Sequence, residues 1–169
     1  AFEESKFRRK GEMVEFRNEV NGPNHQRQEQ LHAIRSSVLR GYEGFYLLYQ
    51  PVVDAKTEKM IGAEALLRWK NDRYGIVPPD QFIPLLESDP LFPELGEWII
   101  KEAIVTSKQI LKNNPDFMMN INLSYTQLEK ADFVDMVFHI LEDMDYPPEH
   151  ICFEVTERCR LLDIDLLKN

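Results

Sequence analysis

The stretch Met60-Ile-Gly-Ala-Glu-Ala-Leu-Leu-Arg-Trp69 determines how we interpret the rest of the chain. Its small and apolar residues alternate with Glu64 and Arg68, which is typical of a β-strand, where successive side chains point to opposite faces. A carboxylate and a guanidinium in such a strand are costly to bury unless they meet partners or a ligand. They therefore form either a structural ion pair on a half-exposed sheet or part of a binding site.

Strands and helices alternate along the chain around this stretch. The order strand, helix, strand implies parallel strands joined by helical crossovers, which is an α/β fold. The expected strands are residues 45–53, 60–69, 117–123 and 151–156, and the expected helices are residues 25–39, 80–86, 94–111 and 124–141, with another beginning at 161–167.

Capping and turn signals give the expected ends of the helices. Gly41 and Gly44 should stop the first helix, and Asp80 is a plausible N-cap after Pro78-Pro79. The segment Ser124-Tyr-Thr-Gln127 has the form of a capping box. The helix that it opens should bury one stripe of residues: Leu128, Ala131, Val134, Phe138 and Leu141.

The composition indicates a soluble, reduced, cytoplasmic protein with room for one domain. The 169 residues are 43% hydrophobic and 29% charged, without an apolar run long enough to cross a membrane or a signal peptide at the start. The two cysteines form no metal-finger pattern. A net charge of -9 argues against a DNA or RNA polymer as partner, and an anionic ligand would need a bound cation or a local arginine.

Each expected strand has one apolar face and one face with hydrogen-bonding or charged groups. Strands joined by crossovers are usually covered, so the polar face should line a barrel lumen or a cleft. On that face Glu64, Asn122 and Glu154 would bring together two carboxylates and a carboxamide. These hard oxygen donors suit Mg²⁺, Mn²⁺ or Ca²⁺. Taken singly, Asn122 could be a turn former and Gln50 a satisfied polar core residue.

Four motifs carry a resemblance to a known family. In order along the chain they are Tyr49-Gln50-Pro51-Val52-Val53, Glu64-Ala65-Leu66-Leu67-Arg68-Trp69, Asn120-Ile121-Asn122-Leu123-Ser124 and Glu154-Val155-Thr156-Glu157. Together they resemble the EAL domain family, the cyclic di-GMP phosphodiesterases. The resemblance implies a TIM-like (β/α)₈ barrel with ligands at its C-terminal rim, of which this chain would form about the first half.

The resemblance also implies roles for particular residues. Glu64, Asn122 and Glu154 match metal ligands, while Gln50 and Arg68 match positions that contact the nucleotide. Glu157 matches a glutamate that steadies a rim loop and would belong with Glu64 to the catalytic set. The implied reaction is hydrolysis of cyclic di-GMP to linear pGpG, assisted by two divalent cations, Mg²⁺ or Mn²⁺.

The expected domain organisation has three parts. Residues 1–20 resemble, more weakly, the end of a GGDEF-like domain, residues 21–41 form a linker helix, and residues 42–169 form a truncated EAL domain. The family's paired aspartates, lysine, later glutamate and glutamine would lie beyond Asn169, so this piece alone should be inactive. Unpaired sheet edges favour a homodimer. The parent protein could be anchored in a membrane elsewhere.

Two alternatives to the enzyme remain open. The domain could be a cyclic di-GMP receptor that binds the nucleotide without cleaving it. It could also be a signalling scaffold, with the helix at residues 25–39 driving dimerisation and the polar face vestigial.

Overall fold

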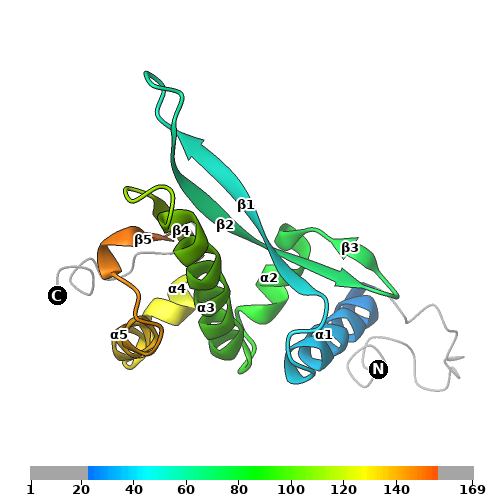
Figure 1. The fold of residues 1–169 in the computed structure, drawn as a ribbon. Coiled ribbons are helices and arrows are strands. Elements are labelled where there is room, and N and C mark those ends of the chain that lie inside the picture. The colour runs from blue at the N-terminus through cyan, green and yellow to red at the C-terminus, as the bar shows by residue number, and fades with distance from the viewer. Residues whose placement is uncertain (1–22, 156–169) are drawn as a thin grey trace, which may run out of the picture.

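The computed structural model describes residues 23–155, in which helices cover one face of a five-stranded sheet (Figure 1). The mixed α/β architecture predicted from the sequence is confirmed. In chain order the elements are α1 (Pro23–Leu39), β1 (Phe45–Val53), β2 (Met60–Asn71), β3 (Gly75–Val77), α2 (Pro79–Leu86), α3 (Phe92–Leu111), β4 (Met118–Leu123), α4 (Tyr125–Leu128), α5 (Phe133–Asp143), the 3₁₀ turn η3 (Pro148–His150) and β5 (Ile151–Val155).

The sheet has the order β1-β2-β4-β5, with β3 pairing with the C-terminal end of β2. Strands β2, β4 and β5 are parallel, as the crossovers predicted. Strands β1 and β3 run antiparallel to β2, which differs from the expected parallel rhythm. The reason is that residues 54–59 and 72–74 are tight connections, too short for a helical crossover.

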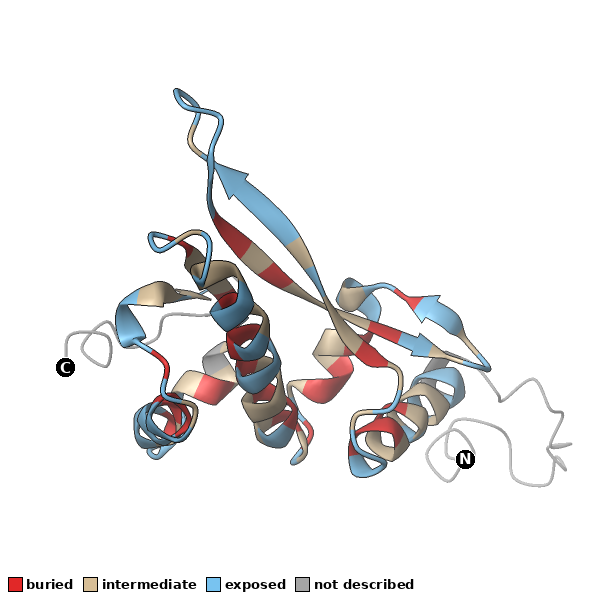
Figure 2. Cartoon of the chain, viewed as in Figure 1, coloured by how far each residue is buried: buried red, intermediate tan, exposed pale blue. Residues whose placement is uncertain are grey.

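The β1–β2 hairpin extends past the helices, and its outer end is exposed (Figure 2). Its turn is held by the Asp54 carboxylate, whose Oδ1 accepts hydrogen bonds from the backbone N–H groups of Lys56 (3.0 Å) and Thr57 (2.8 Å). The Thr57 hydroxyl donates a third bond to the same oxygen at 2.9 Å. These bonds, most of all those from Thr57, favour the charged form and lower the pKa of Asp54.

Helices α3 and α5 cover the parallel part of the sheet. Their apolar side chains, such as Ile104 and Val137, form one continuous core with Ala65 of β2 and Ile121 of β4. Burying this apolar surface is the main favourable contribution to the fold. The odd-numbered residues of β2 and β4 therefore face the helices, and the even-numbered residues face the other way.

A second core surrounds Trp69 at the C-terminal end of β2. Its fully buried indole lies beside Phe82 of α2, with ring centroids 6.1 Å apart, and donates a buried hydrogen bond to the Ser37 hydroxyl at 3.1 Å. Ile34 and Val38 of α1 are buried in the same core. Helix α1 is therefore packed onto the sheet through its apolar stripe, while the assignment of residues 21–41 as a linker stays a prediction.

The helix expected at residues 124–141 is two helices, α4 and α5, separated by a break. The predicted buried stripe is therefore wrong in part, because Val134 and Phe138 are 58% and 57% exposed and Ala131 is exposed too. Helix α5 begins anew at Phe133, which resets the helical phase. Its buried residues are Phe133, Val137, Ile140 and Leu141.

Two smaller local predictions can also be compared with the structure. Asp80 is not the N-cap of α2, because Pro79 opens the helix and the carboxylate makes no capping bond. Helix α1 ends at Leu39 as Gly41 and Gly44 predicted. At Gly44, with φ +82°, an added Cβ would lie 2.1 Å from the Lys70 carbonyl oxygen, so the entry into β1 requires glycine.

Several predictions fall outside the described residues. They are the GGDEF-like remnant at residues 1–20, Thr156, Glu157, and the helix at residues 161–167.

Candidate functional site

The even-numbered, helix-free face of the sheet carries a row of polar side chains. Backbone register places Gln50 of β1 opposite Glu64 of β2, Glu64 beside Asn120 of β4, and Asn120 beside Cys152 of β5. Side chains at paired positions point to the same side of a sheet, so all four belong to one face. Gln50 and Cys152 are exposed, while Glu64 and Asn120 are half-buried.

Glu64 and Asn122 meet directly on this face. The Asn122 carboxamide donates a hydrogen bond from Nδ2 to Oε1 of Glu64 at 2.5 Å. Asn122 is exposed, and the contact is open to solvent. The sequence-based expectation that these two side chains lie together thus agrees with the geometry.

Glu154 has a different partner. Its Oε1 accepts a hydrogen bond from Nδ2 of Asn120 at 2.6 Å, and Asn122 is its neighbour in backbone register. Asn120 was part of a recognised motif, but no role was predicted for it. The available signal was its spacing of two residues from Asn122, which puts both carboxamides on one side of β4.

Gln50 and Arg68 belong to the same polar face of the sheet. The Arg68 guanidinium donates to the Leu67 carbonyl at 2.9 Å, and none of the ion pairs found within residues 23–155 joins it to Glu64. The interpretation of Glu64 and Arg68 as a structural salt bridge is therefore wrong.

The oxygen donors of this face suit a hard divalent cation, for which they would supply part of the coordination shell. Within residues 23–155, no three His, Cys, Asp or Glu side chains cluster closely enough to hold a metal ion. Glu64 and Glu154 would supply carboxylate oxygens and Asn122 an amide oxygen, which are the donors that Mg²⁺ and Mn²⁺ prefer. A complete coordination shell requires additional donors.

The histidines are not part of the polar face. His25, His32 and His139 are exposed. His150 is only half-buried, and its Nδ1 lies 2.9 Å from the Phe117 carbonyl oxygen.

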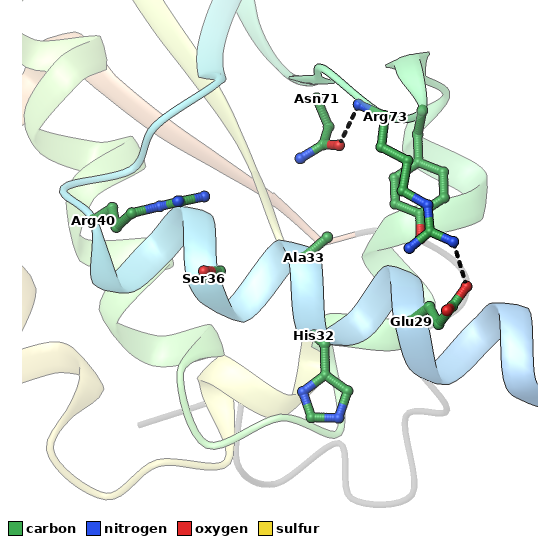
Figure 3. Close-up of a pocket in the computed structure, with 8 residues that line it drawn as sticks. Glu29, His32, Ala33, Ser36, Arg40, Asn71 and Arg73 are labelled. Carbon is green, nitrogen blue, oxygen red and sulfur yellow. Dashed lines mark hydrogen bonds and ion pairs between the residues drawn. The ribbon is translucent and has the colours of Figure 1, made fainter.

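A hollow of about 350 Å³ lies elsewhere, between α1 and the β2–β3 turn (Figure 3). The charged groups that line it are paired: Arg73 donates to Glu29 at 2.8 Å, and Arg40 forms an ion pair with Glu43 at 2.9 Å. The hollow is open, and its arginines are already neutralised by carboxylates. We therefore assign the candidate site to the polar face of the sheet.

Comparison with known proteins identifies the family. The EAL domain family matches residues 32–166, and the chain belongs to this family. MucR of Pseudomonas aeruginosa, named a bifunctional diguanylate cyclase/cyclic di-GMP phosphodiesterase, is 35% identical over 151 residues. That match covers 89% of this chain and 22% of MucR, so the chain spans about a fifth of the length of this curated relative.

Solved structures give the same family and fold. The EAL enzyme Bd1971, in a form bound to cAMP and cyclic di-GMP, matches with a TM-score of 0.74 and 30% identity over 88% of this chain and 42% of that chain. The MucR phosphodiesterase in complex with cyclic di-GMP matches with a TM-score of 0.70 and 38% identity over 76% of this chain and 52% of that chain. The fold is therefore part of a TIM-like barrel, as predicted.

Between residues 23 and 155, no helix combines the length and apolar character needed to cross a bilayer.

Proposed function

We propose that this EAL domain hydrolyses one phosphodiester bond of cyclic di-GMP and releases linear pGpG, with Mg²⁺ or Mn²⁺ as cofactor. The observation that carries the proposal is the contact between Asn122 and Glu64 on the open face of parallel strands, with Glu154 on the neighbouring strand. Membership of the EAL family and the phosphodiesterase names of its relatives support it.

Each side chain of the face has a chemical task in this proposal. Glu64, Asn122 and Glu154 would hold the cation, and the N–H group of Asn120 would keep the Glu154 carboxylate oriented. Arg68 would bind a phosphate, because a guanidinium matches phosphate oxygens and this chain is otherwise strongly acidic. The chemistry that divalent cations supply at such a face is activation of a water and stabilisation of charge on the phosphate oxygens.

The remaining expected features are proposals of the same kind. Gln50, exposed in register with Glu64, would contact the nucleotide, and Glu157, outside the described residues, would steady a rim loop. A homodimer, a GGDEF-like neighbour in the parent protein and a cytoplasmic site of action complete the proposal. In the scaffold alternative α1 drives dimerisation, but Ile34 and Val38 of its apolar stripe are occupied in the core.

The decisive experiment measures cyclic di-GMP hydrolysis by the domain in the longest form that its gene encodes, with Mg²⁺ or Mn²⁺ present. Product pGpG is quantified by chromatography for the unaltered protein, for Glu64→Gln, and for Glu149→Gln as a matched control on the exposed turn η3. We expect Glu64→Gln to lose more than about 100-fold in activity, because even outer-shell partners of metal sites cost 10–100-fold. The control should retain full activity.

Other results would change the assignment. Tight nucleotide binding without turnover in the unaltered protein would make it a receptor. A protein that neither binds nor hydrolyses cyclic di-GMP would favour the alternative of a signalling scaffold.

A further inference from the structure

The turn at the carboxyl end of β4 is held by side chains from other elements. Ser124, the first residue after β4, donates its backbone N–H to Oε1 of Gln127 at 3.1 Å. Its hydroxyl donates to Oε1 of Glu87 at 3.1 Å. Glu87 follows α2 directly as its C-cap, so a glutamate 37 positions earlier in the chain contacts the turn.

The Gln127 side chain has little freedom to move. Gln127 is buried, and its carboxamide lies against Gly96 of α3 so closely that an added Cβ there would be 2.0 Å from Nε2. The glutamine oxygen is thereby directed at the Ser124 N–H. The hydrogen bond of the Ser124 N–H is thus fixed by packing of Gln127 against α3. The hydrogen bond of the Ser124 hydroxyl is made to Glu87.

The loop that carries Glu87 is itself anchored. Asp89, two residues further on, has a side chain that is only 1% exposed, and it pairs with Arg35 of α1 at 2.5 Å. Its other oxygen accepts the backbone N–H of Leu91 at 3.0 Å. A carboxylate held from both sides keeps the α2–α3 loop in one position, and Glu87 with it.

The same turn ends β4, the strand that carries Asn122. Ser124 is two residues after Asn122 and directly follows Leu123, the last residue of β4. A shift of the turn would therefore move the end of β4 and displace Asn122 relative to Glu64.

We propose that Glu87 is a positioning residue, which fixes Asn122 against Glu64 through its hydrogen bond to Ser124. The inference rests on the proposed phosphodiesterase function of the same face. Glu87 contacts neither Glu64 nor Asn122 in the hydrogen bonds of residues 23–155, so its effect is indirect. The feature required of it is a hydrogen-bond acceptor at this point, not a negative charge.

The test compares Glu87→Ala with Glu87→Gln in the full-length protein, measuring kcat and KM for cyclic di-GMP with Mn²⁺. Because a misplacement of about 1 Å can cost 10²-fold, we expect Glu87→Ala to lower kcat by about 10- to 100-fold with a smaller change in KM. Glu87→Gln should restore kcat to within about 3-fold, since its carboxamide oxygen accepts the same hydrogen bond. Ser124→Ala, which removes the donor, should resemble Glu87→Ala.

A second measurement is independent of turnover. Amide hydrogen exchange at Ser124 and Leu123 should accelerate in Glu87→Ala and return to the original rate in Glu87→Gln. Unchanged kcat and exchange in Glu87→Ala would overturn the proposal, as would a Glu87→Gln protein as impaired as the alanine variant. If Glu87→Ala fails to fold, Ser124→Ala decides by the same criteria.

The two hypotheses can fail separately. An unaltered protein without turnover would refute the proposed function, and hydrogen exchange would still test the support of the turn. Turnover that depends on Glu64 but not on Glu87 or Ser124 would refute the positioning role alone.

Discussion

The two faces of the sheet differ in what their residues contact, although they are built from the same strands. Ile121 is 2% exposed among the side chains of α3 and α5, whereas its neighbour Asn122 is exposed and bonded to Glu64. One face contributes stability through burial. The other face holds the residues to which we assign the proposed chemistry and should contribute less stability, so substitutions on the two faces should affect different properties.

Adjacent substitutions in β4 would test this division most strongly. Ile121→Ala should cost about 2–5 kcal/mol of stability, because it leaves a cavity in the core. Asn122→Ala should cost less than about 1.5 kcal/mol, the usual value of one hydrogen bond, and should lower phosphodiesterase activity by more than about 100-fold. Denaturant unfolding and pGpG release measure the two effects. Equal losses of stability would contradict the division.

Arg35→Gln should have the next largest effect, because it removes the charged partner of the buried Asp89 side chain. We expect a loss of about 1–3 kcal/mol, the cost of leaving a buried polar group short of a partner. Arg40→Gln is the matched control, since its ion pair with Glu43 is exposed on both sides and should contribute less than about 1 kcal/mol. The comparison uses denaturant midpoints. A control as damaging as Arg35→Gln would contradict the expectation.

Two tyrosines would test whether a buried hydroxyl group on the helix-covered side of the sheet needs a hydrogen-bond partner for full stability. The Tyr146 hydroxyl shares a 2.7 Å hydrogen bond with Ser107 and donates to the His150 carbonyl at 3.0 Å. Tyr146→Phe should cost about 1–2 kcal/mol. Within the described residues the buried Tyr74 hydroxyl has no partner, so Tyr74→Phe should be neutral or stabilising in the same thermal unfolding measurement.

The smallest effect is expected at the β1–β2 turn, where Asp54 has a lowered pKa. A carboxylate whose pKa is lower in the folded protein stabilises it above the unfolded pKa of about 3.9, and this contribution is lost as pH falls through the folded value. Asp54→Ala should therefore accelerate amide exchange of Thr57 near neutral pH. The difference from the unaltered protein should vanish in acid. A difference that persists in acid would show that charge is not the cause.

The sequence predicted those features whose physical signal is periodic. Alternation in residues 60–69 and 117–123 predicts that Ala65 and Ile121 face away from Glu64 and Asn122, and the structure has this separation. The assigned ligand roles of these residues stay predictions. Helix α5 was placed in the wrong phase because the break before Phe133 has no glycine or proline to mark it.

Other features of the structure cannot be predicted from local sequence patterns. Strand β3 has only three residues, Gly75–Val77, which is too short to show an alternation. The contacts of Asn120 with Glu154 and of Glu87 with Ser124 join residues 34 and 37 positions apart. Side chains so distant in sequence are paired by the tertiary fold, and a single sequence carries no local sign of them.

Cys152 provides a site on the polar face to which a chemical probe can be attached. Its thiol is exposed, lies on the side of β5 that carries Glu154, and stands in register with Asn120. The chain has two cysteines, so Cys159→Ser would leave Cys152 as the single target for a fluorophore or a nitroxide. Paramagnetic Mn²⁺ or a nucleotide arriving at the face would then alter an optical or magnetic signal directly, and occupancy could be followed in a protein that turns over no substrate.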